Sequence, residues 1–389
     1  MSRAGSYVFL AQDRVIFGKP ASEAVIGEAV RRNAQRVFIV ASKTLSRKSD
    51  VVAAIRAALG DRFAGIFDET REHVPRDSVL DAANAVRAAA PDLIVTVGGG
   101  TPIDTVKVML VCLAENITSV DALGDYYIRV KPDGSRDVKA VRPPPMRQIV
   151  VPTTLSGAEF SNLGAAIDPV RQVKDLYTGR EIGSDAVILD PAITVHTPAW
   201  LWLSTGMRAV DHAVETICSK SPQPFTDATC LHGLGMLAKS LRRNQTAPED
   251  LDARLDSQLG VWLATTGLGR VPWGASHGIG HQLGAVAGVP HGYCTCVMLP
   301  AVLRWNKSVN ESQQAMVAKA LGDAGNEAAD VVAHLIADLG MPSRLRDVGV
   351  KRAHFEAIAA GSLTNLFVRQ NPRPVIRRED VLDILESAY

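Results

Sequence analysis

Hydrophobic and polar positions along the chain follow two different periods. In the first half, short β-branched runs alternate with segments of helical period, such as residues 48–59. Ser78 and Asp81 have the spacing of a capping box, which predicts a helix that begins there and runs to about Ala90. The predicted strands cover residues 36–40, 63–67, 92–97 and 148–152. This alternation predicts a mostly parallel sheet with helices on both faces.

The strand signal ends after Asp190-Pro191, and the second half is predicted to be all helical. The helices expected from the apolar spacing cover residues 200–219, 225–242, 249–268, 275–287 and 311–339. We therefore predict an α/β domain over residues 1–195 and an all-α domain over residues 196–389. Residues 124–145 lie between two predicted strands of the first domain, and we interpret them as an excursion that contains a β-hairpin turning at Asp133-Gly134.

Composition narrows the class of function. A chain of 389 residues with 47% apolar content can build two cores. Lys and Arg (42) nearly balance Asp and Glu (41), so neither a nucleic acid nor a membrane surface is expected as a partner, and a small molecule is the predicted ligand. The N-terminal stretch lacks the apolar core of a secretion signal, which predicts a cytoplasmic protein. The cysteines are interpreted as buried or incidental thiols: Cys112, Cys218, Cys230, Cys294 and Cys296.

Three glycines separate a predicted strand from a predicted helix. Gly98, Gly99 and Gly100 follow the strand over 92–97, and the helix is expected to begin near Thr101. Backbone without Cβ atoms can pass close to a ligand, and the free N–H groups of a helix start attract phosphate oxygens. The loop is therefore a candidate cradle for a pyrophosphate group; the alternative is a tight turn with no ligand.

A second loop follows the strand over 148–152 and carries the hydroxyls of Thr153 and Thr154. In a parallel sheet the loops at the carboxyl ends of the strands converge on one crevice, so both loops are expected to face the same ligand. Ordinary turn chemistry is the alternative for the two threonines.

Four histidines stand out in the second half. His277 and His281 are spaced i, i+4, so both imidazoles project from one face of a helix, and Gly278 on the same helix would let a neighbour approach closely. His212 and His291 complete the set, which is typical of a metal site or a proton relay.

These motifs identify a resemblance that spans nearly the whole chain. The glycine loop with Asp104 and Lys107, the Pro152-Thr-Thr154 loop, the His277/His281 pair and Pro290-His291-Gly292 resemble the iron-containing alcohol dehydrogenase superfamily. Its members join a dinucleotide-binding α/β domain to an all-helical catalytic domain, an architecture shared with dehydroquinate synthase. The shortened loop that ends at Glu159 and the tail Asn371-Pro-Arg-Pro-Val375 resemble the maleylacetate reductase branch most, whereas Gly292 and the segment 124–145 depart from it.

The resemblance implies NADH or NADPH as cofactor. It places the pyrophosphate at the 98–100 glycines and Thr101, and it places further contacts at Asp104, Thr153, Thr154 and Lys174. Ser42 follows the strand over 36–40, at the position where a carboxylate would select NAD by repelling a 2′-phosphate, so NADPH is not excluded. The superfamily also suggests a homodimer.

The metal of the superfamily is held by an aspartate one helical turn before a histidine and by two further histidines. Here the histidines correspond to His212, His277 and His291, but Arg208 occupies the aspartate position. Asp211 is about 100° further round the helix than His212 and is expected to point elsewhere. A guanidinium and a divalent cation repel each other in one pocket, so we predict an enzyme without a catalytic metal.

In this interpretation Arg208 stabilises a developing oxyanion or a substrate carboxylate, and His281 or a neighbouring histidine donates a proton to an enone such as maleylacetate or to a carbonyl. The main alternative is a metal-dependent alcohol dehydrogenase in which Arg208 points outward and the three histidines bind iron or zinc. A lyase of the dehydroquinate synthase type and a catalytically silent binding protein are further alternatives.

Overall fold

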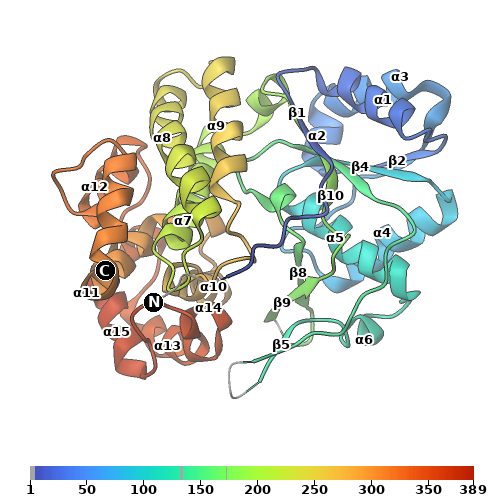
Figure 1. The fold of residues 1–389 in the computed structure, drawn as a ribbon. Coiled ribbons are helices and arrows are strands. Elements are labelled where there is room, and N and C mark those ends of the chain that lie inside the picture. Colours follow the sequence, from blue (N-terminus) through green and yellow to red (C-terminus); the bar gives the residue numbers. More distant parts are fainter. Residues whose placement is uncertain (1–4, 132–134, 172) are drawn as a thin grey trace. The chain divides into compact units, whose positions relative to one another are not determined.

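The computed structural model describes residues 5–131, 135–171 and 173–389, and the chain divides into two compact units (Figure 1). The α/β unit spans Phe9–Thr197. The helical unit spans Pro198–Tyr389 and also includes residues 5–8, which the sequence places in the first domain. Tyr7 joins this N-terminal segment to the helical unit, because its hydroxyl donates to the carbonyl oxygen of Thr266 over 2.8 Å.

A six-stranded parallel sheet forms the centre of the α/β unit, in the order β1-β10-β7-β4-β2-β3. Its strands are β1 (Arg14–Phe17), β2 (Val37–Ala41), β3 (Phe63–Phe67), β4 (Leu93–Gly98), β7 (Gln148–Pro152) and β10 (Ser184–Leu189). The fold class expected from the alternating pattern is confirmed for this half.

Successive residues of the central strands enter two different cores, as the two-residue period of a strand requires. Val37 and Ile39 of β2 lie in one core, with helices α1, α2 and α3, whereas Phe38 and Val40 lie in the other, with α4, α5 and α6. These helices are α1 (Ala21–Arg31), α2 (Lys43–Lys48), α3 (Val51–Leu59), α4 (Arg76–Ala89), α5 (Gly100–Glu115) and α6 (Val120–Leu123). The sheet is therefore covered on both faces.

Two small antiparallel pairs complete the unit. Strand β8 (Leu163–Asp168) pairs with β9 (Val173–Thr178), and β5 (Arg129–Val130) pairs with β6 (Arg136–Asp137). The latter pair is the hairpin predicted within residues 124–145, although its expected turn at Asp133-Gly134 lies outside the described residues.

The predicted capping box at Ser78 is wrong. Helix α4 begins at Arg76, and the carbonyl oxygen of Pro75 accepts the backbone N–H of Val79 as the first helical hydrogen bond. Ser78 lies inside the first turn and is buried, so its side chain cannot act as the N-cap. The proline sets the helix start two residues before the serine because its fixed φ suits the position that precedes a helix.

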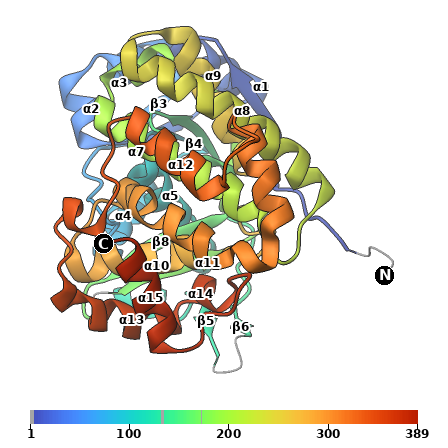
Figure 2. The ribbon, with the colours of Figure 1, turned by 90° about the vertical axis from the view of Figure 1, so that its left-hand side faces the viewer.

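The helical unit consists of helices joined by loops and 3-10 turns. Its helices are α7 (Ala199–Ile217), α8 (Pro224–Thr246), α9 (Leu251–Ala264), α10 (Ala275–Ala287), α11 (His291–Ala320), α12 (Ala328–Asp338), α13 (Phe355–Thr364), α14 (Leu366–Arg369) and α15 (Arg378–Ser387). Helix α10 contacts α11, α13 and α14, and these elements are grouped together in Figure 2. In the described part of the chain, no helix is both long and apolar enough to cross a membrane.

The helix predicted over 311–339 is wrong as a single element. The helical run from His291 to Ala320 instead passes through Pro300 and is interrupted at Asn310 (φ −143°, ψ 33°), and a separate helix begins at Ala328. The apolar run around Pro300 is buried in the core, and this packing outweighs the helix-breaking tendency of the proline. The prediction for the cysteines is confirmed, since none of the five forms a disulfide and all are buried.

Candidate active site

The carboxyl ends of three neighbouring strands form a candidate cofactor site in the α/β unit. Ala41 of β2 lies opposite Val97 of β4, and Gly98 lies opposite Pro152 of β7. The chain passes from β2 to its neighbour β3 at one edge of the sheet, whereas from β4 it passes to β7 and then to β10, toward the other edge. The sheet therefore reverses its direction of winding between β2 and β4. Ligands of doubly wound sheets bind at such a reversal point.

The glycine loop is packed tightly against the second loop. Gly98 has φ 143°, which favours glycine, and a Cβ atom there would lie 2.7 Å from Cγ of Pro102. A Cβ atom on Gly99 would lie 2.8 Å from Cγ2 of Thr154. At Gly100, which begins α5, the nearest atom would be 3.6 Å away, so this position has ordinary space. Protein packing accounts for the first two glycines, and the third leaves the helix start accessible to a ligand.

Three other residues expected at the cofactor, Ser42, Thr153 and Thr154, lie beside the glycine loop. Ser42 adjoins the glycine loop, since its Cβ lies 3.4 Å from a Cβ built on Gly98, and the N–H of Thr153 donates to the Gly98 carbonyl over 3.1 Å. The hydroxyl of Thr154 is buried and has no hydrogen-bond partner in the described chain. The accessible helix start at Gly100 and an unsatisfied buried hydroxyl on the adjoining loop fit a dinucleotide pyrophosphate.

Thr101 lies in the first turn of α5, with Asp104 one turn later. Lys174, in contrast, is exposed on β9 and pairs with Ile167, so it belongs to the two-stranded sheet rather than to the main strand ends.

Lys107 has a structural role that its place in the motif did not disclose. Its fully buried ammonium donates to the carbonyl oxygens of Ala158 and Leu163 over 2.6 and 2.7 Å, and it lies 3.5 Å from Asp104. Burial lowers the pKa of Lys107. Burial also raises the pKa of the neighbouring Glu159 to about 7. Lys107 therefore links the loop that follows β7 to α5, the helix that follows the glycine loop.

A second group of candidate residues lies on the buried face of α7, in the helical unit. Asp211, His212 and Glu215 are all buried, and Asp211 and Glu215 are one helical turn apart. The expectation that Asp211 points elsewhere is wrong, because its Oδ2 lies 3.2 Å from Nδ1 of His277. Every residue from Ala209 to Cys218 is buried, so adjacent positions on α7 can both meet other elements of the unit.

A hydrogen-bond network connects α7 to the start of α10. Oε2 of Glu215 lies 2.7 Å from Nδ1 of His277, and Oε1 accepts the backbone N–H of Ser276 over 3.0 Å. Oδ2 of Asp211 accepts the hydroxyls of Ser276 and Thr295, each over 3.0 Å. Two carboxylates therefore orient one imidazole, an arrangement that the histidine motif alone did not predict.

The four predicted histidines form two stacked pairs. The ring centroids of His212 and His277 are 5.1 Å apart, and both side chains are buried. Those of His281 and His291 are 5.7 Å apart, and both side chains are only partly buried. Phe367 contacts both pairs edge-on, at 6.3 Å from His277 and 5.6 Å from His281. The structure thus separates a buried pair from a more accessible one.

Trp273 extends the buried pair into a cluster of three rings, because its indole lies 4.8 Å from the His212 ring and 4.3 Å from the His277 ring. Within the described residues, Nδ1 of His212 and Nε2 of His277 have no hydrogen-bond partner.

Burial controls the charges of this cluster. It raises the pKa of Asp211 to about 6 and that of Glu215 to about 7, and it lowers the pKa of His277 to about 4 and that of His212 well below its ordinary value. The positive charge of Arg208, which is partly exposed, lowers the pKa of all four groups. It therefore opposes the effect of burial on the two carboxyl groups and adds to the effect of burial on the two imidazoles. Arg208 is therefore the fixed cation of the cluster.

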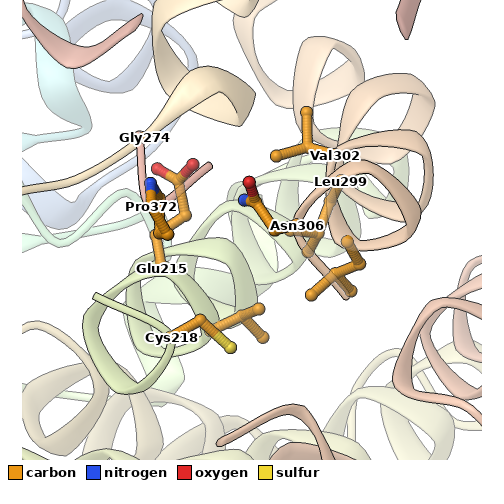
Figure 3. Close-up of a pocket in the computed structure, with 9 residues that line it drawn as sticks. Glu215, Cys218, Gly274, Leu299, Val302, Asn306 and Pro372 are labelled. Carbon is orange, nitrogen blue, oxygen red and sulfur yellow. The ribbon is translucent and has the colours of Figure 1, made fainter. Parts of the chain in front are cut away.

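A small cavity adjoins the network on α7. Glu215 and Asn306 contribute polar atoms to its wall, and the other lining residues are mostly apolar (Figure 3). Cys218 also lines it, and burial raises the pKa of that thiol, so the thiol is held in its neutral form.

The metal ligands of the alternative interpretation, His212, His277 and His291, do not form a compact set. In the described part of the chain, the three His, Cys, Asp or Glu side chains whose ligand atoms lie within 4.8 Å of one another are instead Asp211, Glu215 and His277. The contact of 2.7 Å between Glu215 and His277 is a hydrogen bond; two ligands of one tetrahedral ion with bonds of about 2.1 Å would be about 3.4 Å apart. With Arg208 in place of the superfamily's aspartate, these residues do not fit the superfamily's metal site.

Comparison with known proteins identifies the family to which both parts of the chain are similar. Residues 12–191 match the iron-containing alcohol dehydrogenase family, and residues 202–389 match the C-terminal part of the Fe-containing alcohol dehydrogenase family. The chain is 32% identical to Dehydrogenase FUM7 of Gibberella moniliformis, over 96% of this chain and 95% of that protein. It is 30% identical to 1,3-propanediol dehydrogenase of Citrobacter freundii, over 96% of this chain and 97% of that protein.

A solved structure gives the same result. The crystal structure of maleylacetate reductase from Agrobacterium tumefaciens superposes with a TM-score of 0.82 and 26% identity, covering 100% of this chain and 99% of the other. The family matches span nearly the whole chain, and the relatives are oxidoreductases. The chain therefore belongs to the iron-containing alcohol dehydrogenase family and is an NAD(P)-dependent oxidoreductase.

Proposed function

We propose that this oxidoreductase reduces the activated double bond or carbonyl group of a small carboxylated substrate such as maleylacetate, and that it does so without a catalytic metal ion. In this proposal the α/β unit holds the nicotinamide dinucleotide through the 98–100 loop and Thr154, and the helical unit holds the substrate. The similarity to maleylacetate reductases supports the substrate class.

The charge of Arg208 is the observation that carries the proposal. It acts on Asp211, His212, Glu215 and His277 together, at the position where the superfamily has a metal-binding carboxylate. A permanent cation there opposes a divalent ion and supplies positive charge of its own.

When bound, NAD(P)H supplies a hydride to the electrophilic carbon of the substrate. The π electrons of the attacked bond then move to the substrate oxygen, giving an enolate or an alkoxide. Arg208 stabilises this negative charge, and a proton from His281 completes the saturated product. His281 suits this role better than His277, because its ring is only partly buried and can exchange protons with solvent.

The test is oxidation of NADH and of NADPH with maleylacetate and with simple aldehydes, each with and without a chelator, on protein whose metal content has been measured. We expect chelator-resistant reduction of maleylacetate. Arg208→Gln should lower kcat by about 100-fold and Arg208→Lys by less, in line with the loss of one oxyanion-stabilising group. The matched control is Arg378→Gln, because Arg378 is an exposed arginine paired with Glu356. Stoichiometric iron or zinc with chelator-sensitive aldehyde reduction would contradict the proposal.

A metal-dependent alcohol dehydrogenase is the second candidate, and one observation favours it. Nε2 of His277 is buried without a partner while Glu215 holds Nδ1, which is how carboxylates orient metal-binding histidines. If this candidate holds, Arg208→Asp should raise the affinity for zinc rather than abolish activity.

A further inference from the structure

We infer that the two histidines of α10 are held in opposite neutral tautomers, His277 with its proton on Nδ1 and His281 with its proton on Nε2. Glu215 sets the first tautomer and Asn365 sets the second. Both act as positioning residues, since each acts through a histidine.

The assignment for His277 follows from what faces its Nδ1. Oε2 of Glu215 lies 2.7 Å away and Oδ2 of Asp211 lies 3.2 Å away, so two carboxylate oxygens converge on one ring nitrogen. A proton on Nδ1 attracts both oxygens, whereas a bare lone pair on Nδ1 could accept a proton from one carboxyl group only and would repel the oxygen of the other. The proton therefore lies on Nδ1, and Nε2, which has no partner among the described residues, is an acceptor.

Glu215 is itself held in place. Its Oε1 accepts the Ser276 N–H over 3.0 Å, at the start of α10. Gly274 is the residue immediately before α10, and a Cβ atom there would lie 3.1 Å from Oε1 of Glu215 and 2.5 Å from Oδ1 of Asn371. Oδ1 of Asn371 accepts the N–H of Ala275 over 2.9 Å. Two side chains distant in sequence from α10 thus satisfy the first N–H groups of the helix that carries both histidines.

The assignment for His281 follows from the orientation of the Asn365 amide. Oδ1 of Asn365 accepts the backbone N–H of Phe367 over 2.9 Å, where Asn365 caps the start of α14. The amide oxygen is thereby fixed, and the other end of the group, Nδ2, lies 3.4 Å from Nδ1 of His281. An amide nitrogen only donates, so Nδ1 of His281 is the acceptor and its proton lies on Nε2.

Gly278 allows this contact. A Cβ atom on Gly278 would lie 2.8 Å from the backbone nitrogen of Val368 and 3.0 Å from Oδ1 of Asn365. The close approach expected at this glycine is therefore made by the start of α14, which brings Asn365 to His281.

Opposite tautomers give the two histidines different chemistry. His281 offers an N–H that can donate a hydrogen bond to the developing oxyanion, whereas His277 offers a lone pair that can accept a hydrogen bond from a substrate hydroxyl or from water. This consequence for catalysis rests on the proposed function, but the tautomers themselves do not.

The experiment measures imidazole ¹⁵N chemical shifts in the purified full-length protein labelled with ¹⁵N-histidine, since these shifts distinguish protonated from bare ring nitrogens. The signals are assigned with single His→Gln variants. In the unsubstituted protein, we expect a bare Nε2 and a protonated Nδ1 at His277, and the reverse at His281. The same tautomer at both histidines would overturn the inference.

Two substitutions that keep the helix caps test the cause. Glu215→Gln retains an oxygen for the Ser276 N–H but turns an amide nitrogen toward His277, so the proton should move to Nε2 of His277. Asn365→Ser retains a capping hydroxyl but removes the donor to His281, so the preference at His281 should be lost and kcat should fall about tenfold with KM unchanged. Glu327→Gln and Asn326→Ser are the matched controls, because both residues are exposed.

The outcomes separate this inference from the proposed function. If Asn365→Ser changes neither the His281 shifts nor kcat, the inference fails. If the tautomers are as expected but the protein does not reduce maleylacetate, the proposed function fails and the tautomer assignment stands.

Discussion

Gly99 and Thr154 approach each other so closely that a Cβ atom on Gly99 would lie 2.8 Å from Cγ2 and 3.1 Å from Oγ1 of Thr154. The two residues belong to the two loops that follow β4 and β7, adjacent strands of the sheet. Their contact holds the predicted pyrophosphate loop against the hydroxyl-bearing loop. The shape of the cradle therefore depends on the fit between these two side-chain positions.

Gly99→Ala is expected to push the two loops apart. We predict that it weakens NADH binding by about tenfold and lowers the free energy of unfolding by about 1–3 kcal/mol, the usual cost of an inserted methyl group in a packed site. Combining it with Thr154→Ser removes Cγ2, the nearest clashing atom, and should restore part of both losses. Fluorescence titration with NADH and urea unfolding measure the two effects. Equal binding by the Gly99→Ala variant and the unsubstituted protein would contradict the predicted cradle.

Two glycines of α10 provide a matched pair for the helical unit. Gly278→Ala should lower the free energy of unfolding by about 1–3 kcal/mol and should also lower kcat, because its Cβ would meet the backbone of Val368. At Gly284 the nearest atom to a Cβ is 3.6 Å away, so Gly284→Ala should be neutral or stabilising by up to about 1 kcal/mol. Urea unfolding and steady-state kinetics on both variants test this difference. A similar change in stability and kcat at both positions would show that the effect comes from reduced helix flexibility rather than from the contact between Gly278 and α14.

Glu159 gives the α/β unit a pH-dependent stability. Burial raises its pKa from 4.5 to about 7 in the folded protein. Between these values the folded state keeps a proton that the unfolded state has lost, so the free energy of unfolding should fall as the pH rises from about 4.5 to about 7. Above this range the folded protein carries a buried charge, and Glu159→Gln should raise the free energy of unfolding by about 1–3 kcal/mol.

Urea unfolding of the Glu159→Gln variant at pH values of about 5 and about 8 tests this sign. The stabilisation should be present at the higher pH and should shrink at the lower one. Glu72→Gln, at an exposed position of the same unit, is the control and should show no such dependence. A Glu159→Gln protein that is less stable at the higher pH would indicate that the charged form is held by Lys107 instead.

The sheet and the loops at its edge could be predicted from the sequence because their signals are local. A β-branched run such as residues 36–40 can be recognised without knowing what covers it, and Gly98, Gly99 and Gly100 directly follow such a run. The strands confirm the first half of the fold, and the convergence of the two loops at β4 and β7 follows from the parallel order. Local patterns therefore predicted that these two loops are neighbours, although nothing in them disclosed that Thr154 packs against Gly99.

Features that depend on distant partners could not be predicted. The helical spacing predicts that Asp211 points away because adjacent residues of a helix face directions about 100° apart. In the structure α7 is buried on nearly all sides at this level, so both directions meet other side chains. The contact of Glu215 with His277 joins positions 62 residues apart, and the amide of Asn365 reaches His281 across 84 residues. Lys107 gave no sign of burial either, since its partners are backbone carbonyl groups that any sequence supplies.

Asn371 caps Ala275 from 96 residues further along the chain, and Asn365 reaches His281 from the same late segment. During synthesis, the helix that carries His277 and His281 therefore emerges from the ribosome long before the amides that hold its start and fix its second imidazole. Until that late segment has been translated and has docked, a nascent chain can hold every histidine of the cluster and still lack their final alignment. Competence for the proposed proton transfer would thus be a property that the polypeptide acquires among the last steps of its maturation.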